Sequence, residues 1–220
     1  MGRLALFLAG GAVLLLGLAQ LFLPRIAANR ISSRLGRYGT VESVHVKSWP
    51  AVKLLWGSAD SVTVRARSLS LSPAQTAKLL WEARGFSRIA MAAAGAREGP
   101  LRLSDVRFTK QGQALSANAL LAGADVRSAL PEGVDVQLLS SEDGQVEVKA
   151  TGGLFGLKAS VDAVAAASDG KLVVHAAGAL LSGLQLTLFS DPHVYVQGVG
   201  ASVEQVEPLS YRLTMSASLR

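Results

Sequence analysis

The chain contains no cysteine, and aromatic residues make up only 5% of its 220 residues. The absence of cysteine excludes disulfides, thiolate nucleophiles, iron–sulfur clusters and cysteine-ligated zinc sites. The sequence also lacks the Walker loop, Gly-x-Gly-x-x-Gly, Gly-x-Ser-x-Gly and His-Glu-x-x-His motifs of common enzyme classes. Its three histidines, His45, His175 and His193, lie far apart in the sequence. We therefore expect no enzymatic activity, no bound metal and no cofactor.

Aliphatic residues are abundant, because half of the chain is hydrophobic while few residues are aromatic. The charge is uneven. Residues 1–110 hold 16 Lys and Arg against 5 Asp and Glu, whereas residues 111–220 hold 6 against 11, so a net charge of +11 is followed by one of −5. A basic half beside an apolar N-terminus suits an anionic membrane surface, although a basic face can also serve solubility alone. The charges are dispersed and no nucleic-acid-reading motif is present, so we expect no nucleic-acid partner.

The run from Leu4 to Leu23 is apolar, with Gln20 as its one clearly polar side chain. About twenty apolar residues in a helix span the hydrocarbon layer of a membrane. Residues 1–23 are therefore predicted to be a transmembrane anchor or a cleaved signal segment, and residues 24–220 one α+β domain. The arginines that follow the run favour a cytoplasmic position by the positive-inside rule. This conflicts with the export that an N-terminal hydrophobic segment usually directs.

Two helices are predicted early in the chain. Pro24–Tyr38 carries apolar residues at helical spacing, with arginines beside them that can meet lipid phosphates or merely flank a packed helix. Ser72 and Gln75 form a capping box at the start of the second helix, with Pro73 in its first turn, and this helix ends before Gly85. Leu115–Leu130 is predicted to form two further short helical pieces.

Val41–Leu71 contains two segments in which apolar and polar residues alternate, and alternation of period two is typical of strands with one buried face. The phase of the alternation slips near Ser68, as at a β-bulge. The connection Trp49–Gly57 between the two segments is apolar and holds two tryptophans. Loops are normally polar, so either the protein's own core or a lipid must cover this connection.

The order of these features resembles the LmeA-like family of phospholipid-binding envelope proteins from actinobacteria. The features are a valine-rich strand, Trp49-Pro50, an apolar segment, Trp56-Gly57 and a long alternating strand. The apolar N-terminus fits the family too, and the resemblance extends from about Pro24 to the C-terminus. It implies an elongated domain similar to tubular lipid-binding domains. It also implies a place in the cell envelope or periplasm, either anchored to the outer face of the cytoplasmic membrane or exported.

From Leu101 onward, apart from the Leu115–Leu130 segment, the sequence indicates strand after strand. Asp143-Gly144 and Asp169-Gly170 are strong hairpin signals, and Leu209–Leu219 is the last strand. About eight strands with early helices predict an α+β fold: an elongated, curved antiparallel sheet wrapped around one or two helices. The polar side of the late strands is often small or apolar, so each face of the sheet needs a cover. A bound acyl chain is one such cover.

The leading hypothesis is a membrane-associated protein that binds an anionic phospholipid in an apolar groove or tunnel, for lipid transfer or presentation. The apolar wall is predicted to comprise Trp49, Val52, Leu54, Leu55, Trp56, Leu80 and Trp81. The headgroup candidates, which flank that segment, are Lys47, Lys53, Arg65 and Arg67. The alternative is a structural envelope protein that uses the same apolar surface to bind a protein partner.

Overall fold

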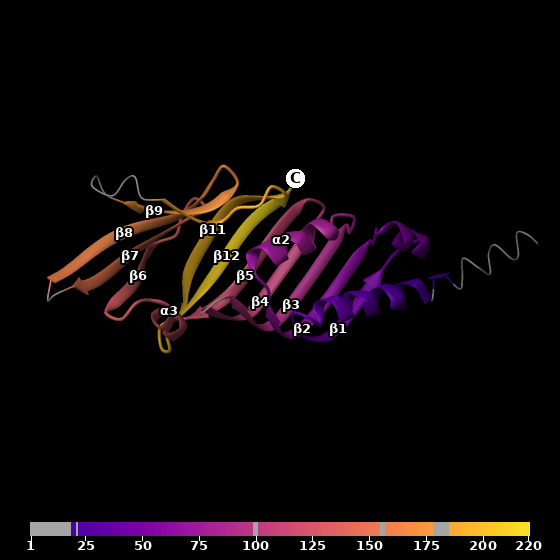
Figure 1. The fold of residues 1–220 in the computed structure, drawn as a ribbon, viewed down its shortest axis with the longest axis horizontal. Helices are drawn as coiled ribbons and strands as arrows, with labels where there is room; N and C mark the ends of the chain where they lie inside the picture. Colours follow the sequence, from indigo (N-terminus) through magenta and orange to yellow (C-terminus); the bar gives the residue numbers. More distant parts are fainter. Residues whose placement is uncertain (1–18, 21, 99–100, 155–156, 178–184) are drawn as a thin grey trace, which may run out of the picture.

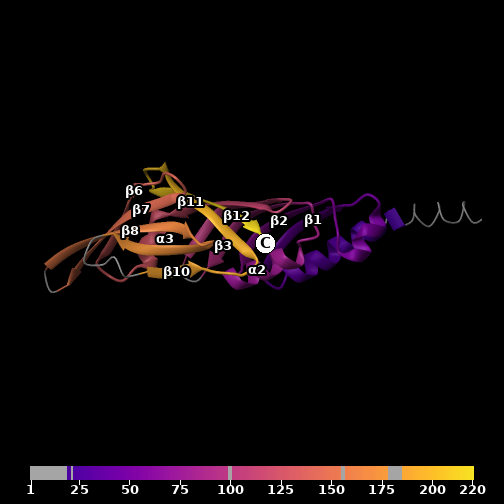
Figure 2. The same cartoon turned by 90° about the horizontal axis from the view of Figure 1, so that it is seen from above.

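The computed structural model describes residues 19–20, 22–98, 101–154, 157–177 and 185–220, and shows an elongated molecule built on two β-sheets with a few helices (Figures 1 and 2). The sheets are open, curved and almost entirely antiparallel, which confirms the predicted α+β class. None of the helices in these ranges is long and apolar enough to cross a membrane. Most of the predicted anchor or signal segment, residues 1–18 and 21, lies outside the described residues.

The first sheet has seven strands in the order β1-β2-β3-β4-β5-β12-β11. Its strands are β1 (Gly39–Lys47), β2 (Ser61–Ser70), β3 (Arg88–Glu98), β4 (Leu101–Gln111), β5 (Ala114–Ala122), β11 (Val194–Gln205) and β12 (Ser210–Leu219). Neighbouring strands are antiparallel except β2 and β3, which are parallel. A parallel pair needs a crossover connection, and helix α2 (Pro73–Glu82) supplies it.

The second sheet is a meander of five strands in the order β10-β9-β8-β7-β6. They are β6 (Val134–Ser140), β7 (Gln145–Leu154), β8 (Leu157–Ser168), β9 (Lys171–Ala177) and β10 (Gln185–Phe189). The two predicted Asp-Gly turns join β6 to β7 and β8 to β9. All four of their residues have positive φ, between 50° and 76°, which is the conformation a two-residue hairpin turn requires.

The tips of these two hairpins lie against β11, the edge strand of the first sheet. The backbone N–H of Val196 donates to the carbonyl of Gly170 at 2.9 Å, and the N–H of Val199 donates to the carbonyl of Gly144 at 2.9 Å. An edge strand exposes unpaired backbone groups, so the hairpin tips use some of those groups to join the two sheets end to end.

Two helices pack on one face of the first sheet. Residues 22–35 form a helix whose Ala27, Ile31 and Leu35 pack against buried valines of β1 and β2. Helix α2 lies over β5, β11 and β12, where Ala77 is buried beside Leu115 and other core residues. A short 3-10 helix, η1 (Ala51–Trp56), joins β1 to β2, and helix α3 (Gly123–Ala129) follows β5.

Several predictions from the local sequence are confirmed. The capping box forms as expected, because Ser72 Oγ accepts from the N–H of Gln75 while the Gln75 side chain accepts from the N–H of Ser72. The register between β1 and β2 shifts opposite Ser68, where the alternation changes phase.

Strand β3 lies in an Ala-rich stretch to which the sequence pattern assigned no element. One prediction is wrong. Leu115–Leu130 is not two helical pieces: its first half is β5, and only the second half is helical. Ala and Leu have high intrinsic helix propensity. Pairing on both sides, with β4 and β12, overrides that propensity in β5.

Candidate functional site

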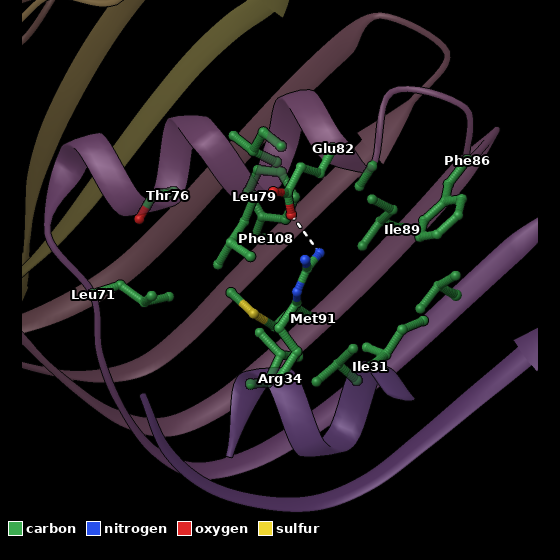
Figure 3. A pocket seen from close by; sticks show the side chains of 15 residues that line it. Ile31, Arg34, Leu71, Thr76, Leu79, Glu82, Phe86, Ile89, Met91 and Phe108 are labelled. Atoms are coloured by element: carbon green, nitrogen blue, oxygen red, sulfur yellow. Dashed lines mark hydrogen bonds and ion pairs between the residues drawn. The ribbon is translucent and has the colours of Figure 1, made fainter. Parts of the chain in front are cut away.

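An apolar groove of about 200 Å³ lies between the helix of residues 22–35, helix α2 and the first sheet (Figure 3). Its walls come from segments that are far apart in the sequence. The lining residues are Ile31, Arg34, Leu35, Val62, Val64, Leu71, Thr76, Leu79, Leu80, Glu82, Ala83, Phe86, Ile89, Met91 and Phe108. Twelve of these fifteen residues are apolar, so the groove suits a hydrocarbon ligand.

The floor of the groove follows from strand alternation. Val64 on β2 pairs with Met91 on β3, which pairs with Phe108 on β4. Residues directly opposite each other in a sheet project from the same face, so these three side chains form one apolar row beneath the two helices. The next residue along β3, Ala92, is exposed on the other face.

An ion pair bridges the two helices at the edge of the groove. Arg34 Nη1 lies 2.5 Å from Glu82 Oε2, and the side chains are 53% and 34% exposed (Figure 3). An exposed pair of this kind contributes only about 0–1 kcal/mol. The pair therefore links the helices without locking them together.

Lys110 lies beneath the turn that follows α2. Its Nζ donates to the carbonyl of Phe86, which lines the groove, and to that of Arg84 at 3.4 Å. The residue is only 1% exposed, and burial lowers the pKa of its ammonium group. Lys110 thus fixes the end of the groove at which Phe86 stands.

The predicted apolar wall is divided among several places. Leu80 lines the groove. Leu54 packs instead against the core formed by β1, β2 and the helix of residues 22–35, and Val52 is half-buried in η1. Trp81 stacks on His193 with ring centroids 4.1 Å apart, and the Arg84 guanidinium lies 4.5 Å from its ring.

The remaining three wall candidates form an exposed apolar tip. Trp49, Leu55 and Trp56 are 72%, 68% and 76% exposed, and none of them is among the groove-lining residues. We call these three residues the tip. Whether they contact lipid stays a prediction, but the geometry separates them from the groove.

Two side chains hold the tip in place. Asp60 Oδ2 accepts from the Trp49 N–H at 2.6 Å, and this hydrogen bond, with the nearby Lys53 ammonium, keeps the pKa of the Asp60 carboxyl below its usual value. Gln20 brackets Trp49-Pro50, because its Nε2 donates to the carbonyl of Ser48 at 2.9 Å and its Oε1 accepts from the N–H of Ala51 at 2.7 Å.

The headgroup candidates lie away from the groove. Arg65 and Arg67 are exposed on β2, where they alternate with the buried Val64 and Ala66, and so project from the face opposite the groove. Arg67 Nε lies 3.3 Å from Glu42, and Lys53 Nζ lies 3.5 Å from Asp60. The basic residue at the groove is Arg34, which was not among these candidates. Its position beside Ile31 and Leu35 in the predicted helix was the available signal.

One face of the second sheet is also apolar. Cross-strand pairs such as Val148–Ala163 and Val174–Leu186 repeat along it, and every residue of this face that follows is half-buried or exposed. The face comprises Val134, Val136, Leu138, Val146, Val148, Ala150, Val161, Ala163, Ala165, Leu172, Val174 and Leu186. Phe189, at the end of β10, packs on the core beneath α2, so this apolar face adjoins the helix-covered region of the first sheet.

In the described ranges, no three His, Asp or Glu residues gather as ligands for a metal ion. A family model described as LmeA-like phospholipid-binding matches residues 15–218. The chain belongs to the LmeA-like phospholipid-binding family. No curated protein and no solved structure matches it.

Membership of the LmeA-like family confirms the resemblance seen in the sequence and makes phospholipid the ligand class of this protein. The match covers both sheets and the helices around the groove, so the apolar groove belongs to the matched region.

Proposed function

We propose that this LmeA-like protein holds phospholipid acyl chains in the groove between the helix of residues 22–35 and α2. The observation that carries the proposal is the groove's lining, which is apolar apart from Thr76 and the Arg34–Glu82 pair. Ligand sites commonly combine an apolar wall with a few polar groups that orient the ligand.

Arg34 is the proposed phosphate contact. Its guanidinium is half-exposed and, among the described residues, pairs only with Glu82, and a guanidinium matches the geometry of phosphate oxygens in a bidentate arrangement. A phosphate that replaces the Glu82 carboxylate costs only the small free energy of an exposed ion pair. An anionic phospholipid fits the excess of basic residues in the first half of the chain.

The size of the groove limits how much lipid it encloses. Its volume of about 200 Å³ is below the roughly 300–1,000 Å³ of typical ligand pockets. A two-chain lipid therefore needs additional apolar surface, and the open apolar face of the second sheet is our candidate for it. Separation of the two helices, which the weak ion pair permits, is a second source of room.

The proposed setting is the cell envelope, with the protein anchored to the outer face of the cytoplasmic membrane or exported. The proposed role there is transfer or presentation of lipid rather than catalysis. The apolar run Leu4–Leu23 and the basic residues that follow it support contact with a membrane. By the positive-inside rule those basic residues favour the cytoplasmic side, so the outer-face placement rests on the family resemblance and on the export that an N-terminal hydrophobic segment usually directs.

The test is the phospholipid content of the purified full chain, measured by organic extraction and mass spectrometry. Met91→Asp places a carboxylate in the groove floor, where an unpaired charge strongly disfavours hydrocarbon. We expect this variant to lose most of its bound phospholipid. Ala92→Asp is the matched control, because the same change on the exposed face of the same strand should leave the lipid content unchanged.

Circular dichroism of both variants checks that the fold survives. A folded Met91→Asp protein with the lipid content of the wild type contradicts the groove assignment. A wild-type protein free of phospholipid would instead favour the alternative in which the apolar surfaces bind a protein partner.

A further inference from the structure

The tip is an apolar surface that the described part of the chain leaves exposed. Trp49, Leu55 and Trp56 are each more than two-thirds exposed, although η1 packs its Leu54 inward on the core. Two more apolar side chains, Phe22 and Ile26, are 55% and 49% exposed on the neighbouring helix. Exposed apolar groups that gather in one place mark an interaction site.

The tip is fixed to the segment that leads out of the apolar N-terminal run. Both polar ends of the Gln20 side-chain amide bind the backbone on either side of Trp49-Pro50. Gln20 is the one clearly polar residue between Leu4 and Leu23, and this contact accounts for its presence there. Figures 1 and 2 place η1 and the first described turns of the helix at the same end of the long axis, farthest from the second sheet.

We propose that the tip inserts into the boundary between headgroups and acyl chains of a membrane, with the long axis of the protein pointing away from the bilayer. The sequence indicates that a membrane is the partner of the tip. The residues that precede Gln20 are apolar, and the run they belong to is long enough to cross a bilayer. Tryptophan side chains concentrate at the membrane interface, where an apolar ring with a polar N–H fits both environments. Lys47 and Arg25 are exposed on the two segments that Gln20 joins, and so can meet anionic headgroups.

Hydrogen bonds and backbone conformation hold the tip in one arrangement. The Asp60 carboxylate holds the Trp49 N–H, and Gly57 ends η1 in the left-handed conformation with φ of 70°. The tip is thus held before it meets a membrane, which lowers the conformational entropy lost on insertion. The inference does not depend on lipid in the groove, from which the tip is separate.

The experiment uses full-length protein in vesicles of phosphatidylcholine and phosphatidylglycerol. The three tryptophans allow single-tryptophan variants that keep Trp49 or Trp56 and replace the other two with Phe. The matched control is Val206→Trp in a chain with all three native tryptophans replaced by Phe. Val206 is 74% exposed, like the tip residues, but lies in the turn between β11 and β12.

With phosphatidylcholine brominated near the headgroup end of its acyl chains, Trp49 and Trp56 should lose most of their fluorescence and shift to shorter wavelength. The tryptophan at position 206 should keep its emission. The proposal is overturned if the tip tryptophans remain unquenched by brominated lipid and open to acrylamide, as expected of a tip that docks on a protein. Trp81 is replaced in every variant, so quenching of Trp81 by lipid bound near the groove cannot contribute to the fluorescence loss.

Discussion

A single buried lysine fixes one end of the groove. Lys110 donates hydrogen bonds to the carbonyls of Arg84 and Phe86, and no acidic group within the described residues forms an ion pair with it. Burial without a counter-charge lowers its pKa. The carbonyls follow α2, where the helix dipole is negative, so the position still favours a cation.

Lys110→Met should destabilise the protein, because two carbonyls lose their donor at a cost of about 1–3 kcal/mol for each that stays buried. Its effect should also depend on pH. The folded pKa is lowered, so between that pKa and the unfolded value of 10.5 the unfolded state binds more protons, and the wild type gains stability as pH rises. Denaturant unfolding at neutral and alkaline pH should show the gap between wild type and Lys110→Met widening with pH. A gap that narrows over that window contradicts the assignment.

At the scale of elements, α2 is both a crossover and a wall of the groove. Its first turn is held by the reciprocal hydrogen bonds of Ser72 and Gln75, and the next residue, Thr76, lines the groove. Its middle is held by Ala77, which is buried on the core. The local cap thus positions a residue that lines the groove.

Ser72→Ala should lower the free energy of unfolding by about 0.5–2 kcal/mol, since it removes the acceptor for the N–H of Gln75. Ser72→Asp keeps an acceptor at the helix start and should retain most of the stability. Ser70→Ala, at an exposed position of β2, is the control for loss of a serine hydroxyl. Urea denaturation of the three variants checks the prediction, and equal stability of Ser72→Ala and Ser70→Ala would contradict it.

At the scale of the whole molecule, the junction between the sheets depends on close backbone approach. A Cβ at Gly170 would lie 2.1 Å from Cδ2 of Tyr195, and one at Gly144 would lie 3.3 Å from the Cα of Gly198. Tyr195 is itself stacked beneath the Arg220 guanidinium, 3.8 Å from its ring centre. Because glycine has no side chain, Gly144 and Gly170 allow this close approach. The approach places the apolar face of the second sheet next to the helix-covered face of the first sheet.

Gly170→Ala should loosen this junction. Gly112→Ala is its matched control, because Gly112 also has positive φ, 60° against 76°, but an added Cβ there meets nothing within 4 Å. Both variants carry the backbone strain of about 1–3 kcal/mol, while only Gly170→Ala displaces Tyr195. Hydrogen exchange of the Val196 amide, which donates to Gly170, should quicken in Gly170→Ala alone. Equal exchange rates of the Val196 amide in the two variants would show that the contact between the added Cβ and Tyr195 does not loosen the junction.

Several local features of this protein follow from short stretches of its sequence. The cap of α2, the alternation of β2 and the two Asp-Gly turns are set by residues within a few positions of each other, so local patterns suffice to predict them. The family was also recognisable from one short stretch around Trp49-Pro50 and Trp56-Gly57.

Contacts between distant elements, in contrast, set which surfaces of the chain are covered. The strand character of β3 and β5 comes from partners on both sides, because their alanines carry little alternation of their own. Ile31, Met91 and Phe108 meet in the groove although long stretches of chain separate them. The tryptophans predicted to form the apolar wall are instead exposed at the tip or stacked on His193. The hydrophobicity of a side chain indicates that its burial is favourable, but the packing of distant elements determines which groups cover it.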